Sequence, residues 1–456
     1  MNFIEAMFNR SVDTYRDAFQ ACDITSEWMR KAIEDWFELY FRKMPSETED
    51  PCQQIPYTIV RKLSKTVFSE YKASSGDAFA QSVLDALEEK KHDAMQLALI
   101  GGESKLKPVP TKTGFRFHVI SRYNILVFGR DAAGNMTDVG TAEQSVEGKY
   151  YYTLLERRTV DTQGYLTIRN SLYASNSKDS LGKRVSLQSL PRYADLPEVY
   201  TFSRPVGSVG LVSLRTPVAN CVDGTADAVS VYAAAVGLIH NINRNEAQLG
   251  GEFDRGESRI IVSADMLSRD AQGNRVFKDH TFVGLNEDPE TVGVTIFSPE
   301  LREQSFLARK QEYLRNVENI IGLKRGLLSE VEAVERTARE ITSSEGEYNL
   351  TIIDFQQMWE RAVREALRLC GILGQLYRIP GAHELTSDDV VIDWGNGVLF
   401  DEEKTWADYK DMVARGLLKP EIALGWRFGM PCETEADLRK IRQKYMPEAL
   451  DMGGVE

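Results

Sequence analysis

The sequence has few of the residues that cross-link small folds or hold metal ions. Five cysteines are scattered through 456 residues, and no two of them form a CxxC pair. An odd, unpaired set argues against a disulfide framework and a zinc site, and it fits assembly in a reducing cytoplasm. The five histidines also lie far apart, and none forms an HExxH or HxH motif. We therefore expect neither a disulfide nor a bound metal ion.

Long hydrophobic runs are missing as well. No run reaches the roughly 20 apolar residues that a membrane-spanning helix needs. The N-terminal stretch MNFIEAMFNRSVDTYRDAF alternates polar and apolar residues at helical spacing, and it lacks the uninterrupted apolar core of a signal peptide. We expect a protein that has no membrane partner and is assembled in the cytoplasm.

The sequence also lacks the motifs of common catalytic sites. The segment GKRVS at 182–186 is similar to the end of a phosphate-binding loop, but Ser177 replaces the first glycine and Arg184 replaces the serine or threonine. GSVG at 207–210 is too short for a dinucleotide-binding motif, and no GxSxG nucleophile motif occurs. We expect no cofactor and no catalytic residue.

An acidic cluster leaves an enzyme as an alternative. Asp388, Asp389, Asp393 and Asp401 could hold two Mg²⁺ ions, as a nuclease requires. The chain contains 68 acidic residues, so a solvated acidic surface is the simpler interpretation.

The formal net charge is −13. A protein that grips DNA tightly usually presents a basic face, whereas a conduit through which DNA slides needs only weak contact. The candidates for such contact are four cations in one polar segment: Lys324, Arg325, Arg336 and Arg339. They alternate with glutamates, so the alternative is ordinary pairing of surface charges at helical spacing.

The periodicity of apolar residues predicts an α+β fold. With 42% hydrophobic and 27% charged residues, the composition is typical of a globular protein. Stripes such as Trp28, Ile33 and Trp36 predict helices within residues 1–105, including helices over 57–73 and 78–97. From 106 to 225 the apolar residues alternate with period two between turn clusters, which predicts a largely antiparallel β region.

The second half of the chain predicts a helical hairpin with a β tip. A helix over 226–250 ends at Gly250-Gly251, a β-rich insertion covers 251–299, and a second helix covers 300–322. The polar segment 323–348 is predicted to be a loop, and a long helix follows over 349–377. Residues 378–456 carry a strand near Val391 and short acidic helices.

Several segments together resemble one protein family. The segments PVANCVDGTADAVSVYAAAVGLIHNIN (217–243), LREQSFLARKQEYLRNVENIIGL (301–323) and ERTAREITSSEGEYNLTI (335–352) are similar, in this order, to segments of siphophage portal proteins. The family carries a Thr-Ala-x-Glu-hydrophobic signature before its long helix. Here the signature is Thr337, Ala338, Arg339, Glu340 and Ile341, and Arg339 stands where the family more often has threonine. The resemblance covers about 217–430, including an acidic strand and helix-turn at 393–424, whereas the first 200 residues match only in organisation.

The resemblance implies the multidomain portal fold. Residues 1–225 would be the wing (helical over 1–105, β-rich over 106–225), and 226–250 and 300–322 would be the stem helices. The clip would cover 251–299, the tunnel loop that meets DNA 323–348, the long wing helix 349–377 and the crown 378–456. The clip would dock the terminase and later the head–tail adaptor through residues that include Ile260, Val262, Phe282, Val294 and Ile296.

The resemblance also implies an assembly. The family forms a ring, a dodecamer, at the portal vertex of the virion, where double-stranded DNA is the cargo during packaging and ejection. The implied partners are the terminase large subunit, the head–tail adaptor, and the major capsid and scaffolding proteins. Another virion assembly protein, such as a minor capsid or tail component, is the alternative.

Overall fold

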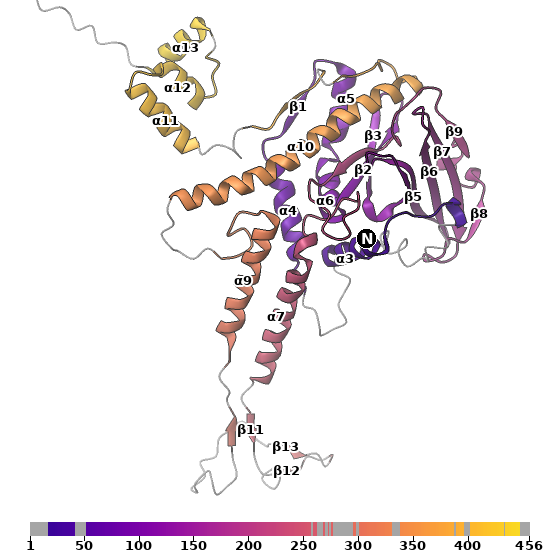
Figure 1. Ribbon diagram of the computed structural model, residues 1–456, viewed down its shortest axis with the longest axis horizontal. Helices are drawn as coiled ribbons and strands as arrows, with labels where there is room; N and C mark the ends of the chain where they lie inside the picture. The colour runs from indigo at the N-terminus through magenta and orange to yellow at the C-terminus, as the bar shows by residue number, and fades with distance from the viewer. Residues whose placement is uncertain are drawn as a thin grey trace, which may run out of the picture. The chain divides into compact units, whose positions relative to one another are not determined.

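The computed structural model describes most of the chain and divides it into two compact units. The first comprises residues 1–65 and 74–391, and the second comprises 66–73 and 392–456. The described residues are 17–41, 52–256, 259–261, 268–269, 272, 275–276, 295–297, 301–330, 338–386, 389–395, 402–432 and 434–446. The predicted α+β class agrees with the mixture of helices and antiparallel strands (Figure 1).

The helices α3 (Glu27–Phe41), α4 (Ile55–Val67), α5 (Ala78–Glu88) and α6 (Lys91–Gly101) precede the first long strand. The predicted stripe of α3 is buried at Ile33 and Trp36, but Trp28 is 77% exposed, so its assignment to the stripe was wrong. The single helix predicted over 78–97 is two helices. Asp77 caps the first of them by accepting a 2.7 Å hydrogen bond from Ala80 N.

Two antiparallel sheets follow, as the period-two alternation predicted. The first has the order β10–β2–β3, formed by Val212–Arg215, Glu103–Pro110 and Phe115–Ser121, and α5, α6 and α10 pack against it. The second is a meander of β4 (Ile125–Arg130), β5 (Met136–Glu147), β6 (Tyr150–Val160), β7 (Leu166–Ser175) and β8 (Lys183–Val185), with β9 (Val199–Thr201) also paired to β7. Neighbouring residues of a strand point to opposite faces. Accordingly, Leu154 and Leu155 of β6 enter two separate apolar clusters.

A pair of helices carries short strands at its end. These are α7 (Val236–Arg255) and α9 (Glu303–Ile321), which pack against each other. Between them in sequence, β11 (Arg259–Ile261) pairs antiparallel with β14 (Thr295–Phe297), and β12 (Ser268–Arg269) pairs with β13 (Arg275–Val276). The bounds of α9 agree closely with the predicted helix 300–322.

The prediction for α7 was wrong at both ends. Residues 226–232 are not helical, because their backbone bonds to other parts of the fold: Val231 N donates to Leu99 O at 3.0 Å, and Thr216 Oγ1 donates to Val229 O at 2.7 Å. At the other end the helix continues through Gly250-Gly251 to Arg255. A glycine inside a helix costs only about 1 kcal/mol, which packing readily overcomes.

The long helix α10 (Ala338–Leu376) begins eleven residues before its predicted start at 349. The apolar stripe in its sequence begins at Ile352, which is fully buried, and the predicted start followed this stripe. Once the part with this stripe is helical, each further residue adds a hydrogen bond at little cost, and the helix extends towards its N-terminus. The predicted loop 323–348 is therefore wrong for residues 338–348.

The second unit contains short helices. They are α11 (Glu402–Ala414), α12 (Pro420–Arg427) and α13 (Glu435–Tyr445), and α12 packs against both of the others. Arg442 Nε of α13 donates to Glu421 Oε1 of α12 at 2.7 Å. The predicted strand near Val391 is β15 (Val391–Asp393), which pairs with β1 (Lys72–Ser74). Within the described part of the chain, no helix is long and apolar enough to cross a membrane.

Candidate nucleic-acid interface

The turn that follows α9 carries two of the predicted DNA-contact residues. Gly322 ends the helix in the left-handed conformation with φ +75°, and Leu323 N donates to Glu318 O at 2.8 Å, which is the usual geometry of a helix C-terminus. Lys324 and Arg325 follow immediately, and both are exposed. The structure thus places these two cations on the surface, as predicted.

A buried glutamate organises this turn. Glu318 lies in the last turn of α9 and is only 2% exposed. Its carboxylate accepts hydrogen bonds from Gly326 N at 3.3 Å, from Ser329 N at 2.9 Å and from Ser329 Oγ at 2.7 Å, and also from Leu328 N. Hydrogen bonds to an ionised carboxylate are strong, so the segment that carries Lys324 and Arg325 is held in one conformation.

Helix α4 lies beside the turn, as Figure 1 shows. Lys62 Nζ donates to Leu327 O and joins two segments that are 265 residues apart in sequence. On the same helix, Arg61 lies 5.9 Å from the ring centre of Tyr57. Sequence reasoning missed α4 as a functional element. The signal was available, because residues 55–67 contain three cations and no acid in a strongly acidic chain.

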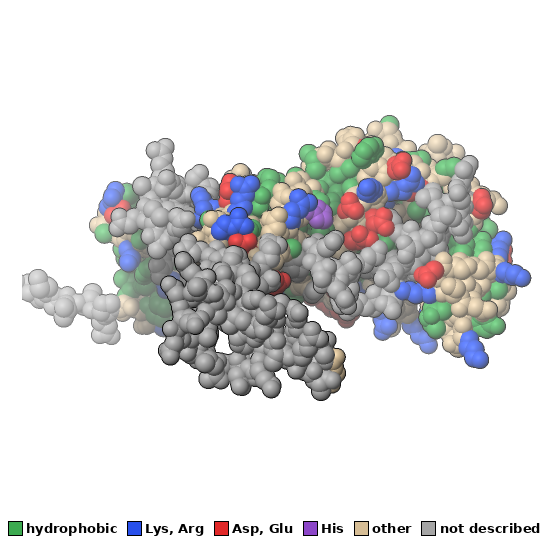
Figure 2. All heavy atoms as spheres, turned by 90° about the horizontal axis from the view of Figure 1, so that it is seen from below, with side chains coloured by type: hydrophobic (Ala, Val, Ile, Leu, Met, Phe, Trp, Pro, Cys, Tyr) green, Lys and Arg blue, Asp and Glu red, His purple; other side chains and the backbone are tan. Residues whose placement is uncertain are grey.

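A basic groove runs between α7 and α9. It has a volume of about 520 Å³, and Arg244, Arg302 and Arg309 line it. Arg302 forms two 2.9 Å hydrogen bonds with the carboxylate of Glu252. Seen from below, Lys and Arg side chains gather left of centre (Figure 2). The helix pair therefore presents cations as well as apolar side chains.

Of the other predicted DNA-contact residues, Arg339 does not lie in a loop. Arg339 lies in the first turn of α10, together with Ala338, Glu340 and Ile341 of the family signature. Arg336 and Thr337 lie outside the described residues. Of the four expected loop cations, the structure thus describes Lys324 and Arg325 in a turn and Arg339 in a helix.

The predicted docking residues of the β tip are described in part. Ile260 and Ile296 are opposite each other in the β11–β14 ladder. Val262, Phe282 and Val294 lie outside the described residues. The ladder agrees with the predicted β character of the insertion.

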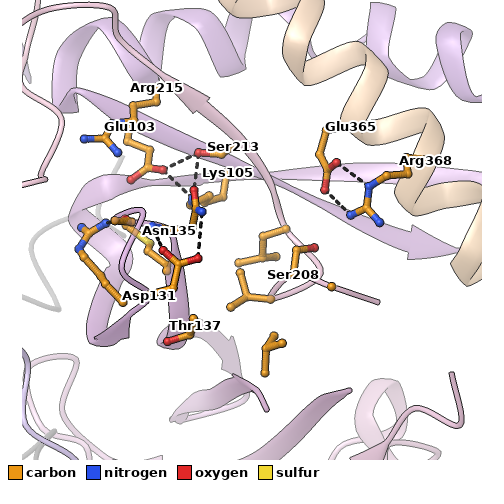
Figure 3. Close-up of a pocket in the computed structure, with 17 residues that line it drawn as sticks. Glu103, Lys105, Asp131, Asn135, Thr137, Ser208, Ser213, Arg215, Glu365 and Arg368 are labelled. Atoms are coloured by element: carbon orange, nitrogen blue, oxygen red, sulfur yellow. Dashed lines mark hydrogen bonds and ion pairs between the residues drawn. The ribbon is translucent and has the colours of Figure 1, made fainter. Parts of the chain in front are cut away.

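A polar cavity lies between the two sheets and α10. It has a volume of about 510 Å³. Figure 3 shows Glu103, Lys105 and Ser213 joined on one side and Glu365 paired with Arg368 on the other. Lys105 Nζ donates to Ser213 Oγ at 2.9 Å. Although burial raises the pKa of Glu103, the charge and hydrogen bond of Lys105, with Ser213 and Arg122, lower it to about 2.

This cavity has the composition of a structural ion-pair site. Lys105 Nζ lies 2.5 Å from Glu103 Oε1, and Ser213 Oγ donates to the same carboxylate oxygen at 2.5 Å. The Glu103–Lys105–Ser213 group therefore joins β2 to β10.

The acidic cluster of the nuclease alternative is engaged locally where it is described. Asp389 accepts from Thr386 N at 2.6 Å and from Thr386 Oγ1 at 3.0 Å, which lowers the pKa of its carboxyl. Asp393 accepts from Gly395 N at 2.9 Å. Asp388 and Asp401 lie outside the described residues, and no group of metal-ligating side chains occurs among the described ones.

Comparison with known proteins does not identify the family of this chain. No protein-family model and no curated protein matches the chain. A solved structure described as the neck of a native GTA particle computed with C12 symmetry is similar at a TM-score of 0.45 and 12% identity, over 92% of this chain and 99% of that one. A TM-score below 0.5 does not establish a common fold, so this likeness supports no conclusion about the present chain.

Proposed function

We propose that this chain is a subunit of the portal ring of a tailed bacteriophage, the channel through which genomic DNA enters and leaves the capsid. The observation that carries the proposal is the α7–α9 helix pair, which carries strands at its end and leaves large apolar side chains exposed. Phe253 is 45% exposed, Leu307 38% and Ile320 47%. These side chains lie on both helices of the pair, and we interpret them as contacts that neighbouring subunits cover.

The positions of these side chains favour a ring over a simple dimer. At 100° per residue, Leu307 and Ile320 point about 140° apart around α9. A partner on one side of the helix cannot cover both. A cyclic ring provides a neighbour on each side, because its interface joins two different patches of each subunit.

The sequence resemblance supplies the rest of the proposal. The segment order of residues 217–430 is similar to that of siphophage portal proteins, in which the helix pair is the stem and the β tip is the clip. On this basis the partners are duplex DNA, the terminase large subunit, the head–tail adaptor, and the capsid and scaffolding proteins. The protein would act at the portal vertex of the virion and carry out no catalysis.

Negative-stain electron microscopy with native mass spectrometry on the purified full-length chain tests the proposal. We expect closed rings with an axial hole wide enough for a DNA duplex and a single subunit number. Filaments, or a monomer that persists at high protein concentration, would contradict it and favour a minor capsid or tail component.

A further inference from the structure

Helix α4 is a basic element in an acidic protein. The whole chain has 68 acidic residues against 55 lysines and arginines, yet residues 55–67 (IPYTIVRKLSKTV) contain Arg61, Lys62 and Lys65 and no acid. Arg61 and Lys65 are exposed, and Lys62 is half-buried. At 100° per residue the three side chains occupy about 100° of the helix circumference. They therefore form one charged face.

This face continues onto the turn after α9. The hydrogen bond from Lys62 to Leu327 O joins the two elements, and the hydrogen bonds to Glu318 hold the turn in place. Together they form what we call the α4–turn surface: Tyr57, Arg61, Lys62, Lys65, Lys324 and Arg325. Of these, Tyr57 adds an aromatic ring that is 42% exposed.

Three cations of this surface have no carboxylate partner among the described residues. Neither an ion pair nor a side-chain hydrogen bond to a carboxylate engages Arg61, Lys65 or Arg325 within the described part of the chain. Several other surface cations are paired with carboxylates. For example, Lys310 lies 2.8 Å from Glu246, and Arg364 lies 2.7 Å from Glu360. Exposed cations that lack carboxylate neighbours favour an external anion.

We propose that the α4–turn surface binds the phosphate backbone of double-stranded DNA. The partner's identity rests on the proposed function, and the rest of the argument is charge complementarity. From Tyr57 to Lys65 the helix rises about 12 Å, a length along which duplex DNA carries about seven phosphate charges. Because Glu318 orders the turn in advance, contact with DNA costs little conformational entropy there. The contact is independent of base sequence, since lysine and arginine reach phosphates from outside the grooves.

The test is the salt dependence of DNA binding by the assembled full-length protein. The fluorescence anisotropy of a labelled duplex of arbitrary sequence is measured between about 50 and 200 mM salt, a range in which phosphate contacts weaken strongly. In the R61Q/K65Q variant we expect the slope of log affinity against log salt to become shallower by about 2, and the affinity at ~50 mM salt to fall about 100-fold. The single variant R325Q is expected to reduce the slope by about 1.

The matched control is K112Q/K149Q, which removes the same charge from two exposed lysines in the β2–β3 and β5–β6 turns. The proposal requires this control to bind DNA like the wild type. A wild-type protein that shows no salt-dependent binding, or an equal loss in both double variants, overturns it.

Electron microscopy and native mass spectrometry on the same samples separate this inference from the proposed function. Intact rings whose DNA affinity does not depend on Arg61 and Lys65 would refute the inference and leave the ring proposal standing. If R61Q/K65Q folds but fails to assemble while K112Q/K149Q assembles, the surface contacts an acidic second copy of the chain and the DNA proposal is wrong. If no sample forms rings, the proposed function fails, while an affinity lowered only in R61Q/K65Q still supports the inference.

Discussion

Buried charges at single residues hold the sheets of the first unit together. Glu156 of β6 is 7% exposed and lies 2.8 Å from Lys107 of β2 and 2.6 Å from Arg158. Although burial raises the pKa of Glu156, the charges and hydrogen bonds of Arg158 and Lys107 lower it to about 2. A carboxyl whose pKa is lower in the folded state stabilises the fold above its unfolded pKa, and this stabilisation is lost as the pH falls through its folded pKa.

The variant E156Q tests this contribution. Since the pKa falls from its ordinary value of 4.5 to about 2, the variant is expected to lose about 3 kcal/mol of unfolding free energy near pH 6. The loss should shrink below pH 4.5 and be less than about half of its full value at pH 3. Urea unfolding at the two pH values, followed by intrinsic fluorescence, measures it. The exposed Glu147 at the end of β5 provides the control, because E147Q is expected to change stability at neither pH.

At the residue scale, the sequence predicted which charged side chains are exposed but not which residues pair with one another. Lys324 and Arg325 were predicted to be at the surface and are exposed. The partners of Glu156 come from residues 49 positions earlier and two positions later, and no spacing rule predicts the first of these. Trp28 was misassigned because helical periodicity places an apolar residue on a face without showing whether another element covers that face.

At the scale of the element, the sequence predicted the bounds of one helix of the pair correctly and those of the other incorrectly. Gly322 ends α9 through its local backbone conformation, and the predicted and observed bounds of this helix nearly coincide. The start of α7 depends instead on hydrogen bonds from Val231 to Leu99 and from Thr216 to Val229, which are long-range contacts. The effect of a glycine inside a helix is equally hard to predict from the sequence, because it depends on which residues pack against that glycine in the fold.

Two helical glycines give opposite predictions for the same substitution. Gly371 of α10 packs against the backbone, and a methyl group there would lie 2.8 Å from His383 O and 2.9 Å from Leu385 N. Gly250 of α7 has nothing within 4 Å of the same position. G250A should therefore stabilise the protein by about 0.5–1 kcal/mol through helix propensity. G371A should destabilise it by at least about 1 kcal/mol, because the backbone of 383–385 must move.

Chemical denaturation of the two glycine variants beside the wild type measures the difference. If both substitutions stabilise the protein, α10 does not pack against residues 383–385 as closely as the structure has it. If both destabilise it, Gly250 has a neighbour in the assembled protein.

At the scale of the whole molecule, the order of elements could be predicted because each type of periodicity is local. Helices first, antiparallel strands next, and then two helices around a β insertion all follow from that periodicity. What covers the exposed apolar side chains is a property of the assembly. It must be tested with intact chains in solution.

The last prediction tests whether those side chains join two different patches, as a ring requires. Leu307 and Ile320 lie on separate sides of α9, so in a ring each belongs to a different interface of the subunit. Each of the variants L307D and I320D is expected to fold and to remain monomeric, because every contact then contains one defective patch. V146D, at an exposed site of the β5–β6 hairpin, should still form rings.

A mixture of the two variants is the decisive sample. The intact Leu307 side of an I320D subunit can bind the intact Ile320 side of an L307D subunit, and the remaining two sides are both defective. Native mass spectrometry should therefore find one-to-one heterodimers in the mixture and monomers in each variant alone. Homodimers of either variant would instead indicate a two-fold interface that uses the same patch on both partners. If either variant still forms rings, the side chain that was replaced lies outside the contacts between subunits. The exposure of apolar side chains on the α7–α9 pair would then no longer support the portal proposal.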